Sequence, residues 1–99
     1  MKISVQREDF DLGDEVRKLS RDSEVGAVAT FIGLVREVPM TLEHYAGMTE
    51  REIAKIMQEA SSRWKVMDAT VIHRYGDLRP TDQIVLVAVA SGHWAHGRR

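Results

Sequence analysis

The chain has 99 residues, 43% of them hydrophobic and 29% charged, with a formal net charge of −1. This length builds a single domain, and the near-neutral charge excludes a general attraction to nucleic acid or to an anionic membrane. No apolar run approaches the roughly 20 residues of a membrane span, and the absence of cysteine excludes disulfides and thiolate metal sites. We therefore expect one soluble, cytoplasmic domain over residues 1–99.

The first third of the sequence predicts a strand, a helix and a longer strand. Ile3 and Val5 alternate with polar residues, as in a short strand. Apolar residues then recur at helical spacing over 10–19, with acidic residues early and basic residues late, and Gly13 marks the expected start of this helix. The almost continuous apolar run 26–32 is typical of a strand covered on both faces, so we expect it at the centre of a sheet.

The middle third predicts a connection and then an amphipathic helix. Because Pro39 cannot donate to a ladder, residues 37–40 are expected to form a connection or a sheet edge before an extended segment, 41–45. Thr49 and Glu52 have the spacing of a capping box. The apolar residues that follow repeat at helical spacing and predict a core-facing stripe of Ile53, Ile56, Met57, Ala60 and Trp64.

The last third predicts two strands separated by a turn. Residues 69–75 and 84–90 are rich in β-forming side chains, and Pro80 lies in the intervening turn, 76–82. The pattern stops after Ser91, so 91–99 is expected to be an irregular tail. The order strand-helix-strand-strand-helix-strand-strand predicts an α+β fold with a mixed β-sheet and two helices.

Two side chains at predicted strand ends are candidates for catalysis or anion binding. Arg36 follows a strand and a glycine, where a guanidinium on a rigid base can grip a phosphate; the alternative is a solvated arginine. His93 follows the last strand, where an imidazole can move protons or bind an anion; the alternative is an ordinary tail residue. His93 and His96 lack further ligands, so we expect no metal. His44 and His73 lie in predicted strands, and we expect each to make a structural hydrogen bond.

Three ordered blocks of the sequence resemble the catalytic, or large, subunit of molybdopterin synthase, the MoaE family. The blocks are Phe31-Ile-Gly-Leu-Val-Arg36, Thr41-Leu-Glu-His-Tyr-Ala-Gly-Met-Thr-Glu50 and Val71-Ile-His-Arg-Tyr-Gly76. The resemblance covers roughly residues 3 to 93. It implies the α/β-hammerhead fold of that subunit, without the C-terminal helix that follows in the family.

The resemblance also implies an activity and partners. In this family, a homodimer of large subunits binds small ubiquitin-like sulfur carriers, giving a heterotetramer. The Gly-Gly tail of the carrier ends in a thiocarboxylate and delivers sulfur to cyclic pyranopterin monophosphate, which forms the dithiolene of molybdopterin in molybdenum cofactor biosynthesis. The implied role is a sulfurtransferase without a cofactor of its own. Sulfur would arrive on the partner, as a cysteine-free chain requires.

The site residues implied by the resemblance come from two segments. Leu34, Val35 and Arg36 match a Gly-x-Val-Arg segment that helps to form the substrate pocket in the family. Ser91-Gly-His-Trp94 matches a Ser-x-His-Arg segment, with tryptophan in place of arginine. The resemblance therefore implies catalytic roles for Arg36 and His93, and substrate contacts for Leu34, Val35, Arg36, His93 and Trp94.

Three departures from the family pattern leave other interpretations open. The connection 37–40 is shorter than the family loop, Trp94 replaces an arginine, and the sequence stops before a segment that carries two functional lysines. The last residues suggest a truncation or a change of reading frame after His93, and a missing helix is expected to leave apolar surface uncovered. One alternative is a catalytically disabled relative that binds its partner or dimerises without turnover. Another is an unrelated small α+β interaction domain.

Overall fold

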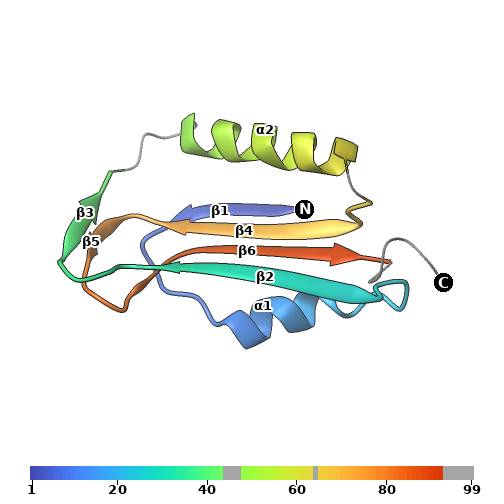
Figure 1. Cartoon of the computed structure of the whole chain (residues 1–99), viewed down its shortest axis with the longest axis horizontal. Helices are drawn as coiled ribbons and strands as arrows, with labels where there is room; N and C mark the ends of the chain where they lie inside the picture. The colour runs from blue at the N-terminus through green and yellow to red at the C-terminus, as the bar shows by residue number, and fades with distance from the viewer. Residues whose placement is uncertain (44–47, 64, 93–99) are drawn as a thin grey trace.

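The computed structural model describes residues 1–43, 48–63 and 65–92, and it confirms the predicted α+β class. These residues form two helices and six strands (Figure 1). The elements are β1 (Lys2–Gln6), α1 (Leu12–Leu19), β2 (Ala27–Leu34), β3 (Met40–Leu42), α2 (Met48–Arg63), β4 (Asp68–Arg74), β5 (Gly76–Leu78) and β6 (Gln83–Ser91). Within this part of the chain, no helix is both long and apolar enough to cross a membrane.

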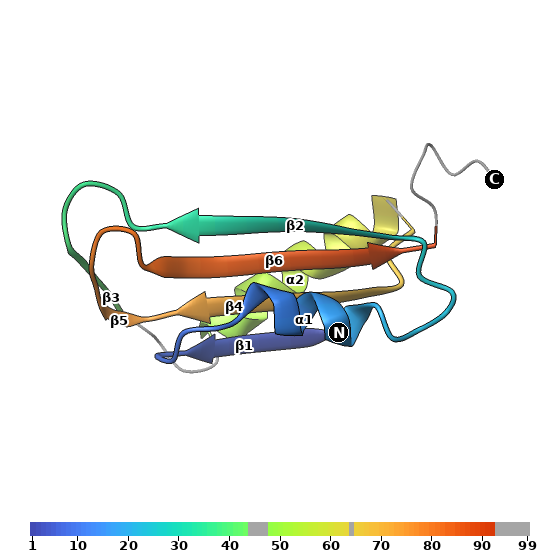
Figure 2. The ribbon, with the colours of Figure 1, turned by 90° about the horizontal axis from the view of Figure 1, so that it is seen from below.

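Four strands form the main sheet in the order β1-β4-β6-β2. β1 pairs with β4 in parallel, whereas β4 pairs with β6 and β6 pairs with β2 in antiparallel orientation, so the sheet is mixed as predicted. The two helices lie on opposite faces of this sheet (Figure 1, Figure 2). β3 and β5 form a separate two-stranded ribbon beyond the end of the sheet where β2 ends.

Each face of the sheet carries a hydrophobic cluster, because alternate residues of a strand point to opposite faces. On the face of α1, Leu19 packs with residues of β4 and β6, namely Ile72, Leu86, Ala88 and Ala90. On the face of α2, Met57 packs with Ala69 and Val71 of β4. β4 and β6 therefore form the middle of the core.

Both predicted helices are present, with corrections in α2. α1 starts next to Gly13 as expected, and the Asp11 carboxylate caps it by accepting from the Asp14 amide at 3.0 Å. α2 begins at Met48, so Thr49 lies inside the helix and the predicted capping box is wrong. Ile56 is 65% exposed, so the stripe prediction is wrong at that position.

The rest of the predicted stripe divides into a confirmed part and an undescribed part. Ile53 and Met57 pack on the sheet as expected. The side chain of Ala60, and Trp64 as a whole, lie outside the described residues. α2 thus contacts the sheet along a narrower face than its apolar pattern indicates.

β2 lies at the edge of the sheet, so its predicted central position is wrong. Among the described residues only β6 pairs with it, and Phe31 and Leu34 are 64% and 54% exposed. Figure 2 shows α2 crossing the sheet obliquely from the β1 edge, so it does not cover the end of β2 that carries Phe31 and Leu34. The predicted last strand, β6, occupies the central position beside β4.

The segment predicted as a simple turn, 76–82, contains a short strand. β5 pairs with β3 in antiparallel orientation, with Met40 opposite Leu78 and Leu42 opposite Gly76. Leu78 is only 2% exposed, so this ribbon has a buried anchor. The extended prediction for 41–45 is confirmed up to Leu42, while His44 and Tyr45 lie outside the described residues.

Candidate functional site

Arg36 follows the end of β2, and the backbone that precedes it is held in place. The preceding residue, Val35, is only 4% exposed, and both of its backbone groups are bonded. Its amide donates to the Asp82 carbonyl at 2.9 Å, and its carbonyl accepts from the Thr81 amide at 2.9 Å. The buried Val35 side chain therefore holds the backbone in place, while the Arg36 side chain is exposed and the last residue of β2, Leu34, presents apolar surface beside it.

Two tight turns meet at this position. The Val38 amide donates to the Arg36 carbonyl at 2.8 Å around Glu37, whose φ is 69°, which is the bonding of a γ-turn with positive φ. In the facing turn the Asp82 amide donates to the Arg79 carbonyl at 2.9 Å. Pro80 and a φ of 76° at Thr81 make it a type II turn. Arg36 thus lies next to strained backbone, which often occurs at functional sites.

The arginines at this end of the sheet fall into two groups. The Arg74 guanidinium is occupied, because it donates to the carbonyls of Arg7 and Gln83 at 3.0 and 2.9 Å. Arg7 stacks on the Tyr75 ring, 4.9 Å from its centroid. Arg36 and Arg79 are exposed, and among the described residues their side chains have no hydrogen bond or ion pair. Their donors are therefore available to an anion such as a phosphate.

A carboxylate at the same end of the sheet is held in its charged form. The Gln83 amide donates to the Asp9 carboxylate at 2.8 Å, and the Arg74 guanidinium lies 3.7 Å from it. The Gln83 hydrogen bond, together with the Phe10 amide and the charge of Arg74, lowers the pKa of Asp9. This contact also ties the segment between β1 and α1 to β6.

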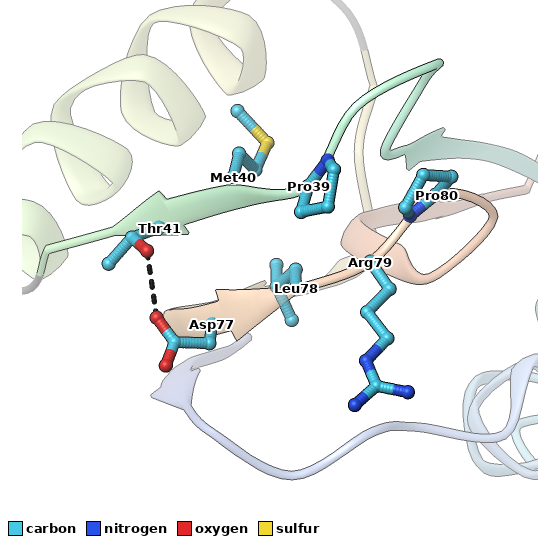
Figure 3. Close-up of a pocket in the computed structure, with 7 residues that line it drawn as sticks. All are labelled: Pro39, Met40, Thr41, Asp77, Leu78, Arg79 and Pro80. Atoms are coloured by element: carbon cyan, nitrogen blue, oxygen red, sulfur yellow. Dashed lines mark hydrogen bonds between the residues drawn. The ribbon is translucent and has the colours of Figure 1, made fainter.

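Two hollows flank the ribbon of β3 and β5. One of about 480 Å³ is lined by Pro39, Met40, Thr41, Asp77, Leu78, Arg79 and Pro80. Figure 3 shows Met40 and Arg79 extending in opposite directions, and the Thr41 hydroxyl donates to Asp77 at 2.7 Å. The other, of about 600 Å³, is lined by Arg7, Thr41, Leu42, Glu43, Tyr75, Gly76 and Asp77. Arg36 lines neither hollow.

The structure does not bring the segment before His93 close to Arg36. Leu34 is paired with Gln83, whereas Ala27, at the other end of β2, is paired with Ser91. Because β2 spans eight residues at about 3.4 Å each, the two ends lie roughly 24 Å apart. His93 and Trp94 lie outside the described residues, but His93 is only two residues beyond Ser91. Within one copy of the chain, Arg36 and the Ser91–Gly92 segment are therefore at opposite ends of the sheet.

Two further predictions about histidines and metals can be compared with the structure. His73 Nδ1 lies 2.9 Å from the Arg74 carbonyl oxygen, which confirms the predicted structural hydrogen bond. In the residues that the structure describes, no group of three or more metal-binding side chains occurs. His44 and His96 are not among these residues.

Sequence reasoning did not single out Arg79 or the strained Thr81. Pro80 gave the only usable signal, because proline favours the second position of a type II turn. Nothing local in the sequence indicates that this turn is joined to Val35. The hydrogen bonds of Val35 to Thr81 and Asp82 bring the turn that begins at Arg79 to the end of β2.

The fold defines a class, the α+β domains in which two helices cover opposite faces of a mixed four-stranded sheet. The chain belongs to the MoaE protein family, whose family model matches residues 5–97. The molybdopterin synthase catalytic subunit of Ralstonia nicotianae is 56% identical over 99 residues, covering 92% of this chain and 56% of that protein. This chain thus spans little more than half the length of that relative.

Solved structures agree with the family assignment. The molybdopterin biosynthesis MoaE protein from Burkholderia ambifaria superposes with a TM-score of 0.86 at 48% identity, covering 94% of this chain and 67% of that chain. A chain in the complex of subunits 1 and 2 of molybdopterin-converting factor from Helicobacter pylori has a TM-score of 0.73 at 14% identity, covering 92% of this chain and 66% of that one. At that identity the likeness concerns the fold alone.

Proposed function

We propose that this chain acts in molybdopterin synthesis, transferring sulfur from a thiocarboxylated small carrier protein to cyclic pyranopterin monophosphate. The observation that carries the proposal is the exposed, unpaired Arg36 on a backbone fixed by Val35, in a chain of the MoaE family. A guanidinium held in this way binds the phosphate of such a substrate through paired charged hydrogen bonds. The chain has no cysteine, which fits a sulfur atom supplied by the partner.

The proposed site contains the residues implied by the resemblance. Arg36 anchors the phosphate and orients the substrate, and Leu34, 54% exposed beside it, offers an apolar contact to the pterin. His93 holds or moves a proton, or binds an anion, and the indole of Trp94 stacks on the pterin ring. Val35 contributes by fixing the backbone rather than through its buried side chain.

We further propose that two copies of the chain share each site. Arg36 and the segment before His93 lie at opposite ends of the sheet, so one copy does not offer both to a single small substrate. A homodimer that places Arg36 of one copy near His93 of the other resolves this separation. The family relationship supports a dimer of this kind, and it also supports a small carrier as partner and a cytoplasmic location.

The alternative function is a binding module without turnover. The structure of the Helicobacter pylori complex contains subunits 1 and 2 of molybdopterin-converting factor, so a protein with this fold is found with a partner. Among the described residues, Arg36 is the only predicted catalytic side chain. A chain that binds the carrier but lacks further catalytic donors would dock it without transferring sulfur.

Single-turnover conversion tests the two functions. The purified chain is mixed with thiocarboxylated carrier and cyclic pyranopterin monophosphate, and the dithiolene formed is measured. We expect Arg36→Ala to reduce the rate about 100-fold or more, because an anion-stabilising donor is lost. Arg36→Lys should recover only part of it, since lysine cannot bind in a bidentate way.

The control variant is Arg51→Ala, which removes an exposed arginine on α2 and should leave the rate unchanged. An Arg36→Ala chain with the wild-type rate and an intact fold would remove Arg36 from the site. Carrier binding by the wild-type chain without any dithiolene would establish the binding module instead.

A further inference from the structure

The backbone that continues from the end of β6 lies directly against Gly26, the residue that precedes β2. The Gly26 amide donates to the Ser91 carbonyl at 2.8 Å. A Cβ on Gly26 would lie 2.7 Å from the Gly92 carbonyl oxygen and 3.3 Å from the Gly92 carbonyl carbon. Both of these atoms belong to the backbone, so no side chain can turn away to make room. The close approach therefore requires glycine at position 26.

Glycine is needed here for space and not for backbone conformation. In the described part of the chain, Gly76 is the only glycine with a positive φ. Gly26 is also exposed, and it lies outside both hydrophobic clusters. Alanine at this position would therefore leave the core intact and would act on the facing Gly92 backbone.

The strand that precedes Gly92 is too firmly held to absorb such a displacement. Ala90 is fully buried, and its carbonyl accepts from the Met67 amide at 2.9 Å. On the other side of β6, Ser91 is paired with Ala27 of β2. A Cβ on Gly26 would therefore displace Gly92 and the chain that follows it. His93 is the next residue in the sequence, one peptide unit away.

We propose that Gly26 is a positioning residue for His93. The missing side chain of Gly26 lets the Ser91–Gly92 backbone lie against the start of β2, and this contact fixes the point from which His93 enters the site. The inference rests on the proposed function, because it concerns the group that holds or moves a proton there. Gly26 acts through the Gly92 backbone and needs no contact with the substrate.

The size of the displacement predicts a loss of rate. An ordinary contact of a Cβ begins at about 3.4 Å, so Gly26→Ala must move the Gly92 carbonyl by several tenths of an ångström. Because a shift of about 1 Å in a reacting group can cost roughly 100-fold in rate, we expect Gly26→Ala to lower the single-turnover rate about 10-fold.

A double-mutant cycle separates positioning from a general loss of structure. If Gly26 acts through His93, adding Gly26→Ala to a His93→Ala chain should change its residual rate by less than about twofold. Val28→Ala is the matched control for stability. It removes a side chain of β2 that packs on the core, and it does not touch Gly92. The folded Val28→Ala chain should keep the wild-type rate.

Nuclear magnetic resonance follows the displacement without catalysis. In ¹H–¹⁵N spectra, Gly26→Ala should shift the amide signals of Gly92 and His93 well beyond the linewidth. The Arg36 amide, at the other end of β2, should keep its position, and Val28→Ala should leave the His93 signal in place. In the wild-type chain the Gly26 amide should exchange slowly with solvent, because it is bonded to Ser91.

The proposal would be overturned by a folded Gly26→Ala chain with the wild-type rate or an unmoved His93 signal. An equal loss of rate with and without His93 would also overturn it, because Gly26 would then act on the structure in general. If Gly26→Ala does not fold, a Gly26 amide that exchanges freely in the wild-type chain would still refute the contact. A His93→Ala chain with the wild-type rate would instead count against the proposed function, while the spectra would still decide whether Gly26 positions this segment.

Discussion

At Thr81 the backbone adopts a conformation that is unfavourable for threonine. It occupies the third position of a type II turn with a φ of 76°, where glycine is preferred. We expect Thr81→Gly to raise the free energy of unfolding by about 0.5 to 1 kcal/mol. Removing the Cβ relieves a left-handed strain of roughly 1 to 2 kcal/mol, and the greater freedom of glycine in the unfolded chain offsets part of that gain. Urea unfolding measures the change.

Thr81→Ala is the matched control for this prediction. It removes the hydroxyl and methyl groups but keeps the Cβ, so the left-handed strain remains and no gain is expected. Equal stabilisation by alanine and glycine would show that the threonine side chain, not the backbone conformation, costs stability here.

The same residues show how far single positions can be predicted from sequence. Arg36 was expected at a strand end, and it lies there, because a glycine and an apolar run mark the end of β2 locally. The conformation of Thr81 could not be predicted, because its strain is offset by a hydrogen bond to Val35, which is far away in the sequence. The separation of Arg36 from the segment before His93 depends on the antiparallel pairing of β2 with β6, which no local pattern reports.

Asp9 links two elements, and its effect on stability depends on pH. The Gln83 hydrogen bond lowers the pKa of Asp9 in the folded chain. A lowered pKa contributes stability that is fully present above the unfolded value and is lost as the pH falls through the folded value. We therefore expect Asp9→Ala to destabilise the chain at pH 7. The difference from wild type should shrink as the pH falls below the usual aspartate range near 4.

The size of this effect is limited by solvent. The Asp9 side chain is 63% exposed, so we expect a loss of less than about 1 kcal/mol. Chemical unfolding at a series of pH values measures it. Glu8→Ala, which removes an exposed neighbouring carboxylate with no side-chain contact in the described structure, is the control and should show no such trend. A pH-independent loss in Asp9→Ala would assign the effect to packing.

Among the helices and strands, the local sequence pattern predicted whether a segment is a helix or a strand better than it predicted the position of that segment in the fold. β1, α1, β2, β4 and β6 were all expected, because periodicity and charge order act within one segment. β5 was missed, since three residues carry too little pattern to separate a strand from a turn. β2 was placed wrongly because an apolar run indicates a strand but does not report which strands pair with it.

At the scale of the whole molecule, the question is whether residues of one copy or of two copies form each site. A mixture of two inactive variants answers it. Arg36→Ala and His93→Ala chains are each expected to be almost inactive alone in the single-turnover assay. Mixed in equal amounts after dissociation, half of the dimers contain one copy of each kind. In a shared site, such a dimer joins the intact Arg36 of one copy to the intact His93 of the other at one of its two sites. The mixture should therefore recover about a quarter of the wild-type activity.

Two controls fix the meaning of that recovery. Each inactive variant, dissociated and reassociated alone, should regain nothing, because both sites of its dimers lack the same residue. No recovery in mixtures that are shown to contain dimers would mean that sites are not shared between copies.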